Sequence, residues 1–213
     1  MLANPQWFRR LADVPKLNFK SPPEAERAKL PARKVVPDVS RYQVDIRERV
    51  SVMWPLLNGE GSTSVSPARQ WETKPRDGEG PRETALRQLY EQLELPGTLD
   101  DYVGCIQAAT TVLHKHRHGA PWVYTTLEQL YWLMIRIVET YPDAVASNTT
   151  PDRAPFYYGS FAYRSLTSLY EREGYLREAR DLAHRGQRFG GADDAVVASL
   201  DERLVALAHE TDG

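Results

Sequence analysis

The chain has 213 residues, and its 27 Lys and Arg against 29 Asp and Glu give a net charge of -2 and a pI of about 6.2. This length allows one domain of about 130 residues with extensions, and the balanced charge excludes the overall basic character of a typical nucleic-acid-binding protein. The single cysteine, Cys105, excludes an internal disulfide framework and favours a reducing, intracellular compartment.

Residues 1 to 80 are predicted to form an extended, basic, proline-rich arm. They contain more than half of the 15 prolines and a Gly/Ser/Thr-rich stretch at residues 58 to 66, so no long helix can run through most of this segment. They also hold 14 Lys and Arg against 10 Asp and Glu, whereas residues 81 to 213 hold 13 against 19. We expect the basic excess of the arm to lie on an acidic surface.

The arm also carries aromatic residues that a freely exposed tail would not need. Asn4 followed by Pro5 predicts a short capped helix. Residues 39 to 54 fit the alternation of a strand and also helical spacing, and the helical pattern is slightly favoured. We expect these segments to pack on their own domain or on a partner. The predicted partner-binding residues are Trp7, Phe8, Tyr42, Trp54 and Trp71.

From residue 81 onward, apolar residues recur at helical spacing between regular start and stop signals. Pro81 opens the first predicted helix, and Pro96-Gly97 closes it. Thr98 caps the start of the second helix, which ends at Gly119. Thr125, with Glu128 three residues later, forms a predicted capping box for a third helix that stops at Pro142.

The remaining chain is predicted to hold a polar loop and three more helices. The loop covers residues 143 to 153, and the helices run from about Pro155 to Glu173, Tyr175 to Arg188 and Asp193 to Ala208. Short links between most helices make neighbours antiparallel. The sequence therefore predicts a mainly α-helical domain over residues 81 to 213, built from antiparallel helical hairpins as an α-solenoid fragment or a bundle. No stretch reaches the roughly 18 to 20 apolar residues of a membrane span.

One helical pair has a family resemblance over residues 160 to 188. Its spaced residues are Tyr163, Leu166, Tyr170, Gly174, Ala179, Leu182 and Ala183. This pattern resembles one tetratricopeptide or pentatricopeptide repeat, in which a glycine turn joins two antiparallel helices. Gly174 can adopt a positive φ at that turn, and Ala179 lets the second helix approach closely. Thr167 departs from the tetratricopeptide pattern, which often has glycine there, and no second copy occurs about 34 residues upstream.

No catalytic, cofactor-binding or metal-binding residue is predicted. His114 and His118 could share a helix face and supply two metal ligands. No further ligand lies nearby, however, and basic residues in the last turn of a helix complement its dipole. Arg177 and His184 have a spacing tolerated by an Arg-His ribonuclease motif. Acidic residues between them would repel a phosphate backbone.

These patterns favour a non-catalytic structural or scaffold subunit of a larger multiprotein assembly, with no cofactor. Its expected partners are other protein subunits, and nucleic acid is disfavoured. The alternative is an RNA-associated helical-repeat protein or an Arg-His ribonuclease. The resemblance to pentatricopeptide repeats, with the basic N-terminal segment, favours the mitochondrial matrix over the cytoplasm. A mitochondrial assembly could be respiratory, ATP-synthase-like or ribosomal.

Overall fold

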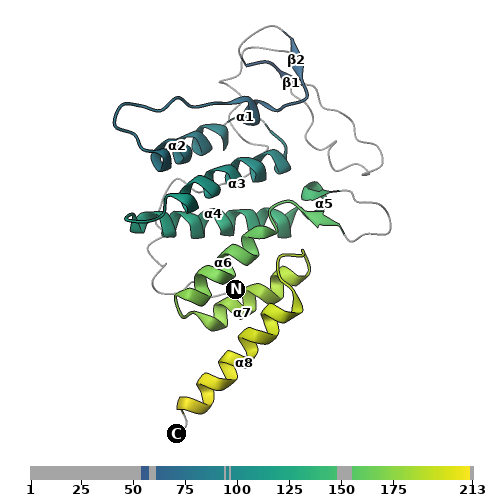
Figure 1. Ribbon diagram of the computed structural model, residues 1–213. Coiled ribbons are helices and arrows are strands. Elements are labelled where there is room, and N and C mark those ends of the chain that lie inside the picture. Colours follow the sequence, from purple (N-terminus) through teal and green to yellow (C-terminus); the bar gives the residue numbers. More distant parts are fainter. Residues whose placement is uncertain (1–53, 58–60, 94, 96, 148–154, 212–213) are drawn as a thin grey trace.

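The computed structural model describes residues 54–57, 61–93, 95, 97–147 and 155–211. Over these ranges the protein is mainly α-helical, which confirms the predicted class (Figure 1). The helices are α1 (Pro67–Gln70), α2 (Pro81–Leu93), α3 (Leu99–Lys115), α4 (Pro121–Thr140), α5 (Pro142–Val145), α6 (Phe161–Arg172), α7 (Leu176–Gln187) and α8 (Asp194–Thr211). Two short antiparallel pairs complete the elements, β1 (Trp54–Pro55) with β2 (Ser62–Thr63) and β3 (Ala146–Ser147) with β4 (Phe156–Tyr157).

The longer helices pack in chain order. In turn, α2 packs on α3, α3 on α4, α4 on α6, α6 on α7 and α7 on α8, so the chain progresses from one end of the stack to the other (Figure 1). The short helices α1 and α5 both contact α3 from the side. One apolar core runs through the stack, from Leu89 of α2 to Leu200 of α8. Neighbours in sequence are thus neighbours in space.

The start of α3 follows the sequence prediction. The Thr98 backbone N–H donates to Asp101 Oδ2 over 3.0 Å, and the Asp101 backbone N–H donates to Thr98 Oγ1 over 3.3 Å. This reciprocal capping box satisfies backbone donors that a helix start leaves without intrahelical partners. Local chemistry within one turn therefore fixes this boundary.

The predicted start of the next helix is wrong. Helix α4 begins at Pro121, and Thr125 lies inside it, where its hydroxyl donates to the Trp122 carbonyl over 2.6 Å. Proline at the first helical position is already set for helical φ and needs no N–H partner. Glu128 therefore does not cap the helix, and its side chain is buried instead.

The region after α4 also differs from the predicted loop and long helix. Pro142 ends α4 but starts the short helix α5, and β3 follows within the predicted polar loop, whose residues 148–154 lie outside the described part. Phe156 and Tyr157 are extended in β4, so α6 begins at Phe161 rather than near Pro155. Gly159, with φ +90°, reverses the chain between β4 and α6. Pairing with β3 overrides the local helical pattern here.

The described part of the predicted arm is anchored on α2 by charged groups. Arg87 Nη2 lies 2.5 Å from Glu79 Oε2, and Arg87 Nη1 lies 3.2 Å from Glu91 Oε1. The hydrogen bond from Arg87 lowers the pKa of Glu79 to about 2. Glu91 also accepts a 2.8 Å hydrogen bond from Trp71 Nε1. These contacts tie residues 71 to 79 to the helical body.

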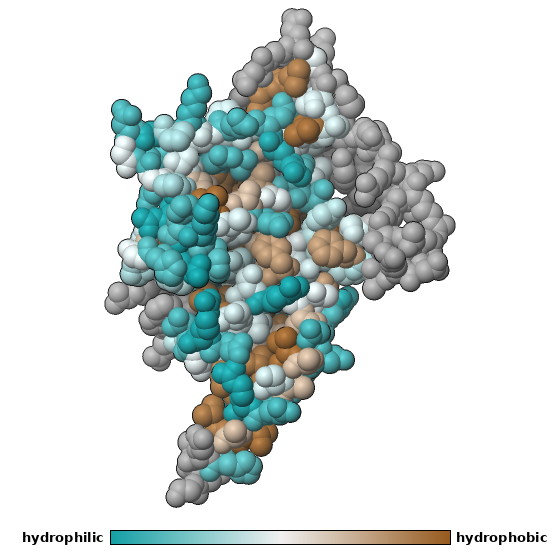
Figure 2. Space-filling model, viewed as in Figure 1, coloured by the Kyte–Doolittle hydropathy of each residue, from teal (hydrophilic) through white to brown (hydrophobic). Residues whose placement is uncertain are grey.

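At the far end, α8 packs through its first half. Val197 and Leu200 are buried, whereas Val205 in the second half is 57% exposed. Hydrophobic surface is visible at this end of the molecule, around α8 (Figure 2). Helix α8 therefore ends the stack with apolar side chains in contact with solvent.

A substitution at the turn between α6 and α7 tests whether its backbone conformation requires glycine. Gly174 has φ +84°, and a Cβ there would meet no atom within 4 Å, so only the backbone conformation opposes a side chain. Gly174→Val should lower the free energy of unfolding by about 1 kcal/mol or more. Gly174→Asn should lower it less, because asparagine tolerates left-handed φ. Urea denaturation measures both, and an unchanged stability for the valine variant would remove the basis for a repeat-like glycine turn.

Candidate functional site

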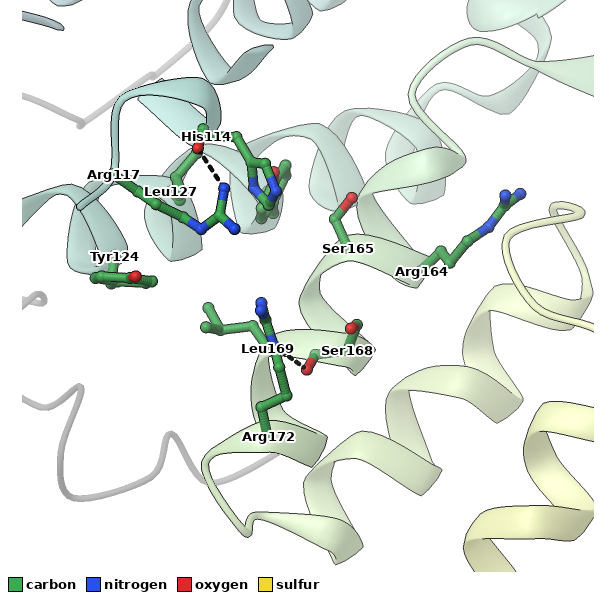
Figure 3. Close-up of a pocket in the computed structure, with 10 residues that line it drawn as sticks. His114, Arg117, Tyr124, Leu127, Arg164, Ser165, Ser168, Leu169 and Arg172 are labelled. Carbon is green, nitrogen blue, oxygen red and sulfur yellow. Dashed lines mark hydrogen bonds between the residues drawn. The ribbon is translucent and has the colours of Figure 1, made fainter. Parts of the chain in front are cut away.

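A pocket of about 250 Å³ lies between α3, α4 and α6 (Figure 3). The lining residues are His114, Arg117, Tyr124, Leu127, Tyr131, Arg164, Ser165, Ser168, Leu169 and Arg172. None of these side chains is acidic, whereas three are arginines. Among the described residues, the pocket therefore has a basic lining with an apolar and hydroxyl-bearing wall.

Helical periodicity brings these side chains to one place. On α6, Ser168 follows Ser165 by three residues, and Arg172 follows Ser168 by four. These three side chains therefore project from one face of the helix. Tyr124 and Tyr131 share a face of α4 in the same way. The end of α3 and the turn after it supply the third wall. The site therefore depends on how three helices cross.

Arg117 and Arg172 face His114 from two different elements (Figure 3). Arg117 Nη1 donates to the His114 carbonyl over 2.6 Å, and Arg172 Nε donates to the Ser168 carbonyl over 3.2 Å. Neither guanidinium forms an ion pair with a carboxylate of the described chain, and the Arg164 guanidinium points away from the other two. Since a guanidinium has five N–H donors, Arg117 and Arg172 retain donors for a ligand.

The pocket electrostatics follow from these two arginines. Burial, and then the positive charges of Arg117 and Arg172, lower the pKa of His114. The imidazole is therefore neutral at pH 7, and one ring nitrogen can donate a hydrogen bond without adding charge. Burial also raises the pKa of Tyr131, so its hydroxyl stays protonated. Such a site suits an oxyanion, because guanidiniums form strong charge-assisted hydrogen bonds to carboxylate and phosphate oxygens.

A second polar cluster lies within the interface between α4 and α6. Tyr170 Oη donates to Glu128 Oε1 over 2.5 Å, and Trp132 Nε1 donates to Tyr170 Oη over 2.9 Å. Glu128 is 2% exposed, and its Oε2 has no hydrogen-bond partner among the described residues. Burial raises the pKa of Glu128 to about 8, so this carboxyl group is largely neutral at pH 7.

The five predicted partner-binding aromatics are distributed unevenly. Trp7, Phe8 and Tyr42 lie outside the described residues. Trp54 lies in β1 and is 1% exposed. Trp71 follows α1 and is 36% exposed. Neither Trp54 nor Trp71 lines the basic pocket.

The two residues predicted for the repeat turn, Gly174 and Ala179, lie in the α6–α7 pair and do not line the pocket. Gly174 connects the two helices, and Ala179 is fully buried on α7. Gly186 was missed by the sequence prediction, although it continues the small-residue spacing of Ala179 and Ala183 along the same helix. A Cβ on Gly186 would lie 2.9 Å from Tyr163 Cβ, so this glycine also permits close approach of α6 and α7.

The histidines singled out by the sequence do not form a metal site or a catalytic pair among the described residues. Helix α3 ends at Lys115, so His114 and His118 do not share a continuous helix face. Within the ranges that the structure describes, no three His, Cys, Asp or Glu side chains are arranged to hold a metal ion. Arg177 and His184 are both exposed on α7, and the His184 ring lies 3.2 Å from Gln187 Oε1. The pocket contains neither of them.

No model of a protein family, curated protein or solved structure matches this chain. Among the described helices, none combines the length and the apolar character needed to cross a membrane.

Proposed function

We propose that this chain is a non-catalytic scaffold subunit of a larger assembly, and that it holds a partner protein by an acidic group seated in the basic pocket. The observation that carries this proposal is the pair Arg117 and Arg172, which face one pocket and form no ion pair within the described chain. A partner carboxylate or phosphate would supply the missing acceptors. Each such charge-assisted hydrogen bond contributes about 1.5 to 3 kcal/mol.

The arrangement of α6 and α7 supports a scaffold of repeat-like hairpins. The two helices pack closely around a left-handed glycine turn at Gly174, and small residues of α7 are buried where they meet α6. Stacked helical hairpins offer extended surfaces to protein partners. On this proposal, the tetratricopeptide-like pair is one unit of the stack, and the pocket lies where α6 meets the preceding helices.

A double substitution tests the proposed function. Arg117→Ala with Arg172→Ala removes two positive charges from the pocket. The matched control, Arg136→Ala with Arg177→Ala, removes two from exposed positions outside it. Full-length tagged proteins are expressed in the native cell, and co-purified proteins are quantified by mass spectrometry. We expect the recovered amount of at least one stoichiometric partner protein to fall about tenfold or more with the pocket variant. The reason is that each arginine contributes more than about 1.4 kcal/mol to the binding free energy.

The comparison depends on equal folding of the three proteins. Circular dichroism and thermal unfolding of the purified chains should coincide, since both pairs of arginines are at least partly exposed. Recovery of the same proteins in the same ratios by all three chains would contradict the proposal. Loss of bound RNA, rather than of a protein, would favour the RNA-associated alternative.

A further inference from the structure

The charge of the pocket exceeds what one carboxylate can neutralise. Arg117 and Arg172 contribute two positive charges on facing elements, whereas the Arg164 guanidinium points away from them. A carboxylate brings one negative charge and two oxygens. A phosphomonoester brings a charge of about -1.5 to -2 at pH 7 and three acceptor oxygens. Two guanidiniums that approach from opposite sides therefore match a phosphoryl group better than a single carboxylate.

Neutral donors in the pocket fit the same group. The His114 imidazole and the Ser168 hydroxyl line the space beside the guanidiniums (Figure 3). A phosphoryl group that binds Arg117 and Arg172 keeps acceptor capacity for such donors. The pocket can thus surround an oxyanion with charged and neutral donors together, without an acidic side chain in the lining to repel it.

The size and the apolar wall of the pocket indicate how the phosphoryl group is carried. The volume of about 250 Å³ is below the roughly 300 to 1,000 Å³ of sites for drug-sized ligands, so it suits the end of a side chain. Tyr124, Leu127 and Leu169 provide an apolar wall beside the basic groups. Such a wall can contact the short carbon stem of a phosphorylated serine or threonine.

We infer that the basic pocket binds a phosphorylated serine or threonine of a partner protein, with Arg117 and Arg172 holding the phosphoryl oxygens. This inference rests on the proposed function and names the chemistry of the partner. Phosphorylation of the partner would then control its attachment to the scaffold, since the unmodified hydroxyl has no negative charge for the guanidiniums.

Three short peptides of one neutral sequence test the inference on the full-length protein. The central residue is phosphoserine, glutamate or serine, and inorganic phosphate and a short RNA oligonucleotide serve as further probes. Binding is followed by calorimetry and by NMR of the histidine rings. We expect phosphoserine to bind about tenfold or more tightly than glutamate, and serine not to bind measurably, because the dianion gains further charge-assisted hydrogen bonds.

The His114 ring provides a readout at the site itself. Groups that face it in the pocket are Arg117 and Arg172, with Tyr124, Tyr131 and Arg164 in the same lining. A bound dianion would offset the two arginine charges, so the phosphoserine peptide should raise the pKa of His114, and the glutamate peptide should raise it less. Arg117→Ala and Arg172→Ala should each weaken phosphopeptide binding about tenfold or more, whereas Arg136→Ala with Arg177→Ala should not change it.

The other outcomes separate this inference from the proposed function. Equal binding of the glutamate and phosphoserine peptides overturns the phosphoryl inference. It remains compatible with the proposed function, in which the pocket binds an acidic group of a partner. Equal binding of inorganic phosphate and the phosphopeptide assigns the pocket to free phosphate, and tighter binding of RNA assigns it to nucleic acid. If no probe shifts the His114 resonances, the phosphoryl inference is wrong. The co-purification comparison still decides the proposed function.

Discussion

Glu128→Gln should make the protein more stable than the wild type by about 3 to 5 kcal/mol at pH 9, and should change its stability far less at pH 5. The reason is the buried carboxyl group between α4 and α6. Burial raises the pKa of Glu128 from 4.5 to about 8, so the folded protein keeps this proton over a pH range where the unfolded chain has lost it. The folded state binds more protons than the unfolded state across this range, so wild-type stability falls as pH rises from about 5 to 8.

Glutamine keeps the acceptor and removes the charge. Its side-chain oxygen can still accept the hydrogen bond that Tyr170 donates to Glu128 Oε1, so the contact with Trp132 through Tyr170 is retained. The amide nitrogen would replace Oε2, which has no partner among the described residues, so the gain at low pH is small or absent. The variant should therefore lack the loss of stability between pH 5 and pH 8.

Chemical denaturation at pH 5, 7 and 9 measures this difference. Glu173→Gln is the matched control, because it removes one carboxylate from an exposed position at the end of α6, three residues after Tyr170. Parallel stability curves for the wild type and Glu128→Gln over this pH range would show that Glu128 does not hold a proton in the folded protein.

Gly186→Leu should lower the free energy of unfolding by about 1 to 3 kcal/mol, because overpacking a close helical contact forces backbone or side-chain shifts. A Cβ at position 186 would lie 2.9 Å from Tyr163 Cβ and 3.0 Å from Tyr163 Cγ. Tyr163 has little freedom to move. Its ring is fully buried and stacks on Phe189 at 5.8 Å, and its hydroxyl donates to Glu139 over 3.0 Å.

Gly104→Leu is the matched control in α3. A Cβ there would meet only the Arg69 guanidinium, at 3.6 Å. This side chain is 54% exposed and its ion pair with Asp101 is long, at 3.8 Å, so it can shift. Because leucine favours a helix interior over glycine by up to about 1 kcal/mol, this variant should be as stable as the wild type or more stable. Thermal and urea unfolding compare the two variants, and equal losses would show that the α6–α7 contact does not depend on Gly186.

The basic pocket was not predicted, and its residues show why. Arg117 and Arg172 lie 55 positions apart in the sequence and belong to segments that each fit an ordinary helix or turn. The sequence prediction considered His114 only with His118, as a metal pair or as part of a basic helix end. His114, Arg117 and Arg172 line one pocket because α4 packs on both α3 and α6. Spacing within one helix carries no information about such a crossing.

Other differences arose where tertiary contacts overruled a local signal. Thr125 and Glu128 have the spacing of a capping box, but Pro121 starts the helix earlier and Glu128 is buried against Tyr170. The sequence predicts a helix that includes Phe156 and Tyr157, but these residues pair with β3 as an extended strand. The partner strand and the residue that covers Glu128 belong to other segments of the chain, so the pattern within one segment does not reveal them.

By itself, the sequence determined the helical class, the capped start of α3 at Thr98 and the left-handed turn at Gly174, because periodicity, caps and glycine φ depend on interactions within about one turn of chain. Only the tertiary structure decided which side chains meet. The packing of α3, α4 and α6 created the basic pocket, the interface between α4 and α6 enclosed the Glu128 carboxyl group, and the packing of α7 on α6 placed Gly186 against Tyr163. These features depend on the direction of side chains across helix contacts, and that direction is set by the three-dimensional packing of the whole stack.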